Sequence, residues 1–234
     1  MSEDTNRLNE WFVPKFGPTQ FRIAIGILFL PYTAMCISFA LLGSLLTPSI
    51  HWERIVGIIV IYFFALGIGA HFADYIGSRK RPWGIEFSKS TSWTVLVLSL
   101  SIAYAIGVYY IILFVPSLSV VAVAEGFFLF AYNFEKFKGY FHTNFWFVIA
   151  WGSLPVLAGF VMQTNAITLE SILVATVAGV ISYIEISLSR PYKALRRSNV
   201  QNGATNTLER YLKIISFGTL STAMLALALR IVLD

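Results

Sequence analysis

Residues 55–76 read IVGIIVIYFFALGIGAHFADYI, and this stretch decides the fold. No Asp, Glu, Lys, Arg or His occurs in it before His71. An α-helix of about 20 apolar residues is long enough to cross about 30 Å of hydrocarbon. The apolar residues are continuous rather than alternating, which argues against a β-strand. The stretch therefore predicts a transmembrane helix whose last turns carry ionisable side chains.

Similar apolar runs occur on both sides of this stretch. Hydrophobic residues make up 57% of the 234-residue chain and charged residues 12%, about half the share of a soluble domain. This composition excludes a disordered chain, a disulfide scaffold and an ordinary soluble enzyme. It predicts an all-α, polytopic membrane helical bundle of about seven transmembrane helices in a single domain, residues 1–234. The predicted spans are residues 21–46, 55–76, 92–114, 118–134, 145–162, 169–188 and 214–233.

The basic residues are distributed asymmetrically about these spans. Of the 17 Lys and Arg residues, all but Arg54 and Arg230 fall in the N-terminal segment, in alternate loops or at the adjoining span ends. Because cytoplasmic loops carry the excess of Lys and Arg, we expect an integral protein of the cell membrane with a cytoplasmic N-terminus and an external C-terminus. Residues 1–20 would form a cytoplasmic or interfacial segment. The same asymmetry explains the net charge of +5 without a nucleic acid partner.

Polar residues gather at the predicted cytoplasmic ends of two spans. His71, Asp74 and Ser78 are spaced to share one face of a helix. Ionisable groups at such depth usually face the interior of a bundle or a water-filled cavity. A second group follows the fourth span and comprises Tyr132, Asn133, Glu135, Lys136 and His142. Any chemistry is therefore expected at the cytoplasmic face.

Glu125 is a separate case, because it lies inside the predicted fourth span. We interpret it either as the partner of another polar group or as part of an interior cavity. The first interpretation is favoured, since charges inside a membrane are usually paired.

Several of these residues resemble the UbiA superfamily of intramembrane prenyltransferases. The stretch Ala70–Ser78, followed by a basic loop with Arg81-Pro82, is similar to the first Asp-rich motif of that family. Asp74 falls on the central aspartate. Residues 151–159, WGSLPVLAG, resemble the Gly-x-x-Pro-x-x-x-Gly pattern of the fifth span. In the region of the second Asp-rich motif, only Glu185 supplies a carboxylate.

The resemblance implies Mg²⁺-dependent transfer of an isoprenyl chain from a polyprenyl diphosphate to a lipid-soluble acceptor. Asp74 and Glu185 would be the catalytic residues, and Asp74, His71 and Glu135 the candidates for holding Mg²⁺. The expected diphosphate-binding residues are Arg79, Lys80, Arg81 and Lys136. The other expected cavity residues are Ser78, Tyr132, Asn133 and His142.

Three alternatives stay open. The chain departs from the Asp-rich motifs, which fits a catalytically silent relative that binds an isoprenoid lipid or serves as a subunit of a membrane complex. His71, Asp74, Glu135 and His142 would suit a different metal, because imidazole favours Zn²⁺, Fe or Cu over Mg²⁺. A transporter is the third. Seven spans are fewer than the nine usual in the family, so a membrane protein partner is expected to supply the remaining wall alongside membrane lipids.

Overall fold

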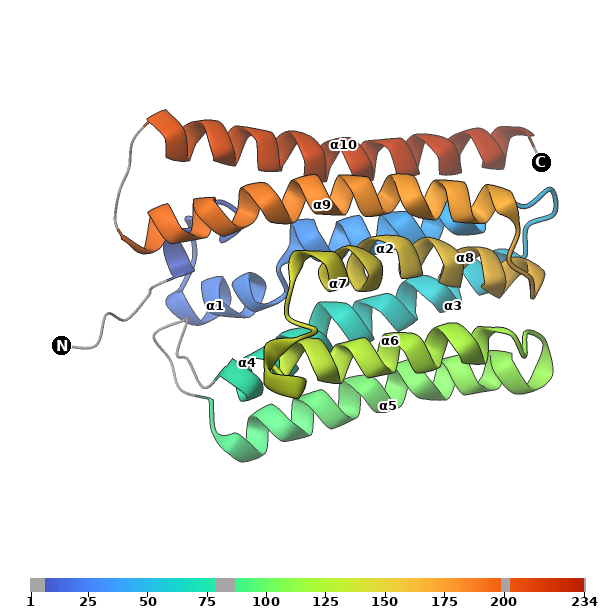
Figure 1. Ribbon diagram of the computed structural model, residues 1–234, viewed down its shortest axis with the longest axis horizontal. Coiled ribbons are helices and arrows are strands. Elements are labelled where there is room, and N and C mark those ends of the chain that lie inside the picture. The colour runs from blue at the N-terminus through green and yellow to red at the C-terminus, as the bar shows by residue number, and fades with distance from the viewer. Residues whose placement is uncertain (1–6, 79–86, 199–202, 234) are drawn as a thin grey trace.

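The computed structural model describes residues 7–78, 87–198 and 203–233, and every regular element in these ranges is helical. The helices lie along a common long axis and form one bundle (Figure 1). The α-helices are α1 (Thr19–Ile27), α2 (Leu30–Ser44), α3 (Trp52–Tyr62), α4 (His71–Ser78), α5 (Lys89–Leu113), α6 (Leu118–Asn133), α7 (Asn144–Val148), α8 (Leu154–Thr164), α9 (Leu169–Arg197) and α10 (Gly203–Leu233).

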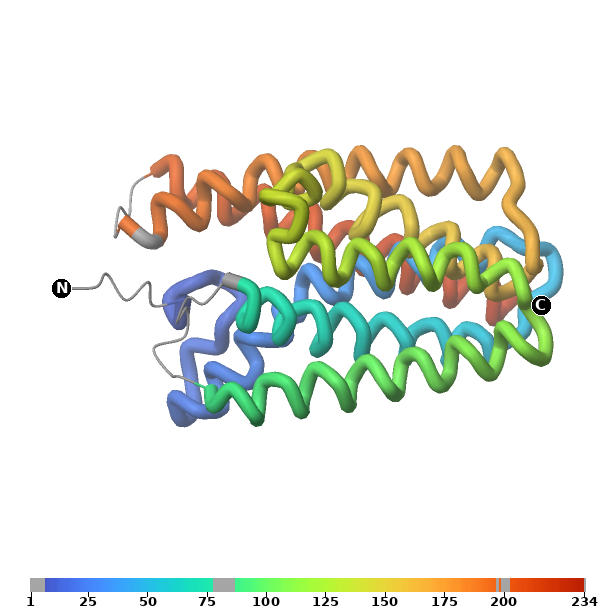
Figure 2. The backbone as a smooth tube through the Cα atoms, turned by 60° about the horizontal axis from the view of Figure 1, so that its bottom comes forward, coloured from blue at the N-terminus to red at the C-terminus, as the bar shows by residue number. Residues whose placement is uncertain are grey.

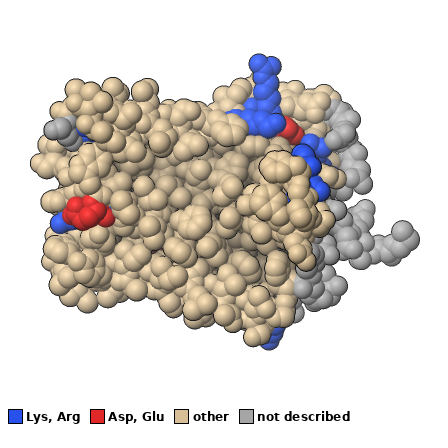
Figure 3. Space-filling model, turned by 180° about the vertical axis from the view of Figure 1, so that it is seen from behind, with Lys and Arg blue, Asp and Glu red and all other residues tan. Residues whose placement is uncertain are grey.

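Six helical segments of the described ranges are long and apolar enough to cross a membrane. They are Thr19–Ser44, Trp52–Gly77, Lys89–Leu113, Asn144–Thr164, Leu169–Arg196 and Gly203–Leu233. The space-filling view shows charged side chains near the two ends and a broad band without them between (Figure 3). The all-helical membrane bundle is thus confirmed. The predicted span 118–134 is a helix, α6, but it has only 16 residues.

The two ends of the bundle differ in character. The described chain begins with residues 7–9 at one end of the bundle, and α10 ends at the other (Figure 1, Figure 2). We call the first the N-terminal end, where α4, α6 and α9 terminate. Short connections of residues 45–51, 114–117 and 165–168 lie at the opposite end. The alternation of basic and short connections seen in the sequence therefore corresponds to two opposite ends of one bundle.

The first span is broken, although the sequence predicted one continuous helix. Phe29 adopts a left-handed backbone conformation (φ 42°) between α1 and α2. Pro31 in the first turn of α2 lacks an N–H and could not continue a preceding helix without losing a hydrogen bond. The Thr33 hydroxyl donates to the Leu28 carbonyl at 2.7 Å and satisfies a group that the break leaves open. The break turns the Phe29 ring inward, where it is buried.

The last two helices extend well beyond the predicted spans 169–188 and 214–233. α9 continues to Arg197 and α10 starts at Gly203, so charged residues that the sequence placed in a loop are helical. Glu209 and Lys213 form an ion pair one turn apart on α10, at 2.7 Å. Arg196 of α9 reaches the same carboxylate at 3.0 Å. These pairs stabilise the helical extensions, and hydropathy alone does not reveal them.

Two spans contain π-helical turns, η2 (Phe63–Ala70) between α3 and α4, and η4 (Ile149–Ser153) between α7 and α8. Such turns are rare and occur frequently at functional sites. Each leads directly to residues at the N-terminal end of the bundle: η2 runs into His71, and η4 contains Trp151.

The closest helix contact joins α2 and α8. Gly159 of α8 lies against the backbone of Ala40, and Gly43 of α2 against the backbone of Val156, so neither position has room for a Cβ atom. Gly159 is therefore a close helix-packing position. Small residues allow two backbones to approach in this way in membrane bundles.

We expect Gly159→Val to separate α2 from α8 and to lower the free energy of unfolding by about 2–3 kcal/mol, the usual cost of overpacking. The measurement is unfolding of the purified protein in detergent. Gly218→Val is the matched control, because a Cβ at Gly218 of α10 meets no atom within 4 Å. Equal stability of the two variants would contradict the close contact.

Candidate functional site

The phenol of Tyr132, near the end of α6, is the centre of a polar cluster. Tyr132 is buried, and its hydroxyl lies within electrostatic reach of Asp74 from α4 and of Glu185 from α9. The guanidinium of Arg190, also on α9, interacts with the same hydroxyl. Three helices distant in sequence therefore bring two carboxylates and a cation to one tyrosine. The two residues expected to be catalytic, Asp74 and Glu185, both act electrostatically on this phenol.

One face of α9 supplies the rest of the cluster. Glu185, Ser189 and Lys193 are four residues apart in succession and so share a face. Glu185 is only 3% exposed, and its charge interacts with the Lys193 ammonium and with the Ser189 hydroxyl. The Tyr32 hydroxyl of α2 lies 3.4 Å from the Ser189 hydroxyl. We define the Tyr132 cluster by the residues Tyr32, Asp74, Tyr132, Glu185, Ser189, Arg190 and Lys193.

Aromatic rings and a histidine fix the orientation of Tyr132. His142 stacks on the Tyr132 ring with centroids 4.4 Å apart, and its Nδ1 lies 3.1 Å from the Tyr132 carbonyl oxygen. The Trp151 ring of η4 also packs against Tyr132, with ring centroids 4.8 Å apart. The predicted cavity residues Tyr132 and His142 are thus brought together, but through stacking rather than as paired metal ligands.

His71 occupies a neighbouring position. Its ring stacks on Phe29 with centroids 4.6 Å apart. The cationic groups of Arg7 and Lys193 lie 5.7 Å and 5.4 Å from the Phe29 ring centroid. A small depression of about 10 Å³ is lined by Arg7, His71 and Asp74, among other residues. Phe29 therefore contacts both His71 and Lys193, and Lys193 is a residue of the Tyr132 cluster.

Other predicted site residues lie apart from this cluster or beyond description. Glu135 and Lys136 are exposed, beyond the end of α6. Asn133 is buried, but its side-chain amide donates to the Leu129 carbonyl of its own helix at 2.7 Å. Ser78 is the last residue of α4, and nothing further is described of its side chain. The expected diphosphate ligands Arg79, Lys80 and Arg81 lie outside the described residues.

Within residues 7–78, 87–198 and 203–233, no group of three or more His, Cys, Asp and Glu side chains could hold a metal ion. The alternative metal site of His71, Asp74, Glu135 and His142 is thus not assembled. His71 faces Phe29, His142 faces Tyr132, and Glu135 is exposed.

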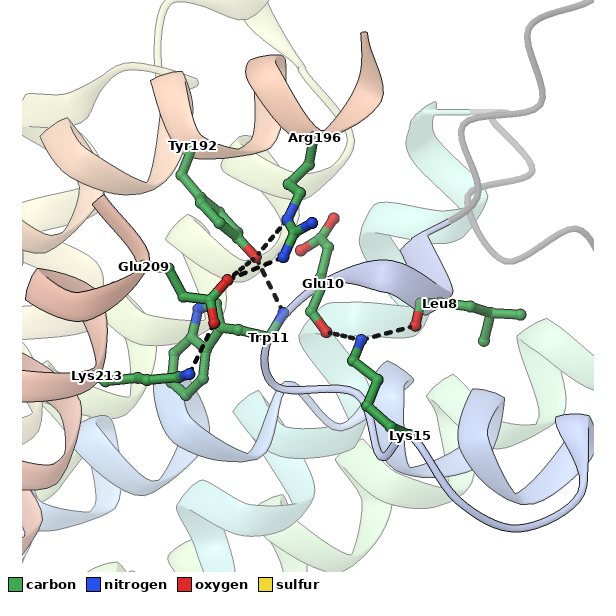
Figure 4. Close-up of polar contacts among 8 residues, drawn as sticks. All are labelled: Leu8, Glu10, Trp11, Lys15, Tyr192, Arg196, Glu209 and Lys213. Carbon is green, nitrogen blue, oxygen red and sulfur yellow. Dashed lines mark hydrogen bonds and ion pairs between the residues drawn. The ribbon is translucent and has the colours of Figure 1, made fainter. Parts of the chain in front are cut away.

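Trp11 and Phe12 of the N-terminal segment pack their rings against Tyr32 of the cluster, which is a feature the sequence did not reveal. Figure 4 shows the Trp11 backbone N–H donating to the Tyr192 hydroxyl, at 3.1 Å. Arg196 donates to that hydroxyl at 3.2 Å and to Glu209 at 3.0 Å. Lys213 donates to the other Glu209 oxygen at 2.7 Å. These contacts tie the segment to α9 and α10, so it packs on protein and does not lie only at a membrane surface.

The same segment adds two groups that sequence reasoning missed. Glu10 is buried at 2% exposure and lies within electrostatic reach of Tyr32. The Lys15 ammonium donates to the Glu10 carbonyl oxygen at 2.8 Å. Partial burial, and next the charge of Arg22, lower the pKa of Lys15 from its ordinary value. No local pattern marks Glu10, because its burial depends on a segment folding back over distant helices.

A second polar feature lies away from the cluster, near the middle of α6. The Tyr62 hydroxyl donates to Glu125 Oε1 at 2.8 Å, so the expected polar partner of Glu125 is present. Glu125 also lines an apolar cavity of about 80 Å³ between α3, η2, α5, α6 and α8. Both interpretations drawn from the sequence therefore hold for this residue.

Comparison of the chain with models of protein families, with curated proteins and with solved structures found no match.

We expect Glu209→Gln to loosen the N-terminal segment, because the neutral amide gives up both charged hydrogen bonds. Stability should fall by about 1–3 kcal/mol, and trypsin should cleave at Lys15 faster than in the wild type. Thermal unfolding and timed proteolysis measure the two effects. Glu53→Gln is the control, since that exposed carboxylate forms only weak surface pairs, with His51 and Arg54. Unchanged cleavage at Lys15 would show that the segment is held by other contacts.

Proposed function

We propose that this protein binds a polyprenyl diphosphate at the Tyr132 cluster and transfers its isoprenyl chain to a lipid-soluble acceptor, in the manner of the UbiA superfamily. One observation carries the proposal: Asp74 of α4 and Glu185 of α9 both act electrostatically on the buried Tyr132 hydroxyl, which also interacts with Arg190. The proposal includes a seventh span formed by α6.

The cluster contains cations that could bind diphosphate oxygens and carboxylates that could hold Mg²⁺. Arg190 and Lys193 are cations, and guanidinium and ammonium groups are the usual ligands of phosphate oxygens. Asp74 would hold Mg²⁺ with assistance from Glu185, and bound Mg²⁺ neutralises diphosphate charge. Asp74 is the stronger candidate, because the Lys193 ammonium already acts on Glu185.

The reaction would break the bond between the isoprenyl carbon and the diphosphate oxygen. The same carbon then bonds to a nucleophilic atom of the acceptor, and the acceptor loses a proton. Arg190 and Lys193 would stabilise the departing diphosphate, while Trp11 and Phe12, which pack against Tyr32, would exclude water from the allylic cation. Tyr32 and Tyr132 would fix the diphosphate through their hydroxyl groups.

The basic N-terminal end would face the cytoplasm of the cell membrane. Arg22, Lys136, Lys138, Arg210 and Lys213 belong to this end, and positive charge favours the cytoplasmic side. The substrate headgroup would then reach the cluster from the cytoplasmic water layer, and its chain would stay at the depth of the apolar spans.

A second candidate function is a silent relative that binds an isoprenoid phosphate or diphosphate without turnover, alone or with a membrane protein partner. It is favoured by the Lys193 ammonium near Glu185, because a neutralised carboxylate is a poor metal ligand. On this candidate, affinity for the headgroup does not depend on Mg²⁺.

The test measures binding of geranylgeranyl thiodiphosphate to the purified full-length protein, with and without Mg²⁺. We expect Mg²⁺ to strengthen binding in the wild type and Asp74→Asn to weaken the Mg²⁺-dependent part by roughly tenfold or more, because a metal ligand is lost. Glu135→Asn is the matched control, since Glu135 is an exposed carboxylate at the same end and Asn tolerates its positive φ.

Three results separate the candidates. Mg²⁺-dependent binding that is lost in Asp74→Asn, followed by product formation with geranylgeranyl diphosphate and an acceptor, supports the transferase. Binding that ignores both Mg²⁺ and Asp74 supports the silent relative. Absence of binding under all conditions rejects both candidates.

A further inference from the structure

The cavity next to Glu125 has no role in the proposed transfer. Its volume is about 80 Å³, and its lining is almost wholly apolar, with side chains such as Ile58, Leu100 and Val121. Its polar side chains are Tyr62, Tyr104 and Glu125. None of the residues of the Tyr132 cluster lines it. The cavity is therefore a second place in the bundle where a molecule could bind.

Glu125 offers this cavity a hydrogen-bond acceptor. Its Oε1 accepts from Tyr62, and no described residue donates to its Oε2. A carboxyl group within a membrane is costly and usually marks a functional position. A pure hydrocarbon in the cavity would leave Oε2 without a partner, whereas a ligand hydroxyl would donate to it. The site therefore favours an apolar molecule that carries one hydroxyl group.

The lining of the cavity reaches the outer surface of the bundle at α5, next to α6. Gly107 of α5 lines the cavity, and a Cβ placed there would meet no atom within 4 Å. The Tyr104 hydroxyl of α5 lies directly against Gly126 of α6. Tyr104 and the neighbouring lining residue Val108 are 43% and 45% exposed. A ligand could enter from hydrocarbon between these two helices.

We propose that the cavity binds the hydroxyl-bearing end of an apolar alcohol, with the hydroxyl donating to Glu125. A space of about 80 Å³ holds roughly six water-sized groups, so only the end of such a molecule fits. The remaining chain or ring passes between α5 and α6 into the hydrocarbon. This site requires neither Mg²⁺ nor a diphosphate, so it stands independently of the proposed transfer.

The probe is a long-chain alcohol with a diazirine near its hydroxyl end, added to the full-length protein in phosphatidylcholine nanodiscs without Mg²⁺. After illumination, mass spectrometry maps the labelled residues. We expect labelling of α5 and α6 residues that line the cavity, such as Ala103 or Ala122. The alcohol should label these residues about fivefold more than the same probe without its hydroxyl, the size expected for one net hydrogen bond.

Variants at two glycines test the location. Gly107→Phe places a ring in the cavity and should reduce labelling roughly tenfold, because little volume is left for the ligand. Gly218→Phe on α10 is the matched control: its Cβ also meets open space, but it faces away from the cavity lining. Gly107→Val serves in place of Gly107→Phe if the latter does not retain the melting temperature of the wild type.

Variants at Glu125 test the chemistry. Glu125→Gln keeps a carbonyl acceptor and should keep the preference for the alcohol, whereas Glu125→Leu should abolish it. The proposal is overturned if the Gly107 variants are labelled like the wild type, or if the alcohol and the hydrocarbon label Glu125→Leu and wild type in the same ratio. Labelling that disappears in Asp74→Asn would also overturn it, since the two sites would then not be independent.

Discussion

The close contact between α2 and α8 determines where the polar residues of the N-terminal end can meet. Gly43 and Gly159 let these two helices approach until backbone touches backbone. Cys36, on the same side of α2, donates its thiol to the Trp151 carbonyl at 3.4 Å. Continuing one turn further toward the N-terminal end, this side of α2 carries Tyr32. The contact thus sets Tyr32 beside α9 and Trp151 beside Tyr132.

The burial of Glu185 at that end determines where the neighbouring cations lie. Glu185 is almost fully buried, and a buried carboxylate is stable only when cations and hydrogen-bond donors compensate for lost water. Lys193 and Ser189, on the same face of α9, provide that compensation. Arg190, next to Ser189 along the helix, is directed to Tyr132 instead. The Arg190 guanidinium therefore does not compensate the charge of Glu185, and in the proposed function it is the group that would bind a phosphate oxygen.

The sequence predicted the helical class and most of the spans, because hydropathy is a local property. It did not predict the break at Phe29, which depends on Pro31 together with burial of the ring. The extended ends of α9 and α10 were missed for another reason: the Glu209 ion pairs join two helices across a chain reversal. Glu10 was missed because only the fold of the N-terminal segment buries it.

Arg190 and Lys193 are two residues whose role in the cluster the sequence did not predict. The sequence analysis counted them only among the basic residues of alternate loops that set the topology. Their spacing from Glu185 was nevertheless readable, five and eight residues along one helix. The sequence did not show that α9 stays helical past Pro191. Only a continuous helix places Glu185 and Lys193 on the same face.

The short helix α6 connects the two proposed sites. Its 16 residues span about 24 Å, less than the hydrocarbon thickness, and it carries both Glu125 and Tyr132. These residues are seven apart, close to two turns, so both project from nearly the same side of the helix. As a seventh span, which is part of the proposal, α6 would need a polar side that faces the bundle, because it carries a carboxyl group at its middle. The requirement that buries Glu125 against Tyr62 thereby also directs Tyr132 toward Asp74 and α9.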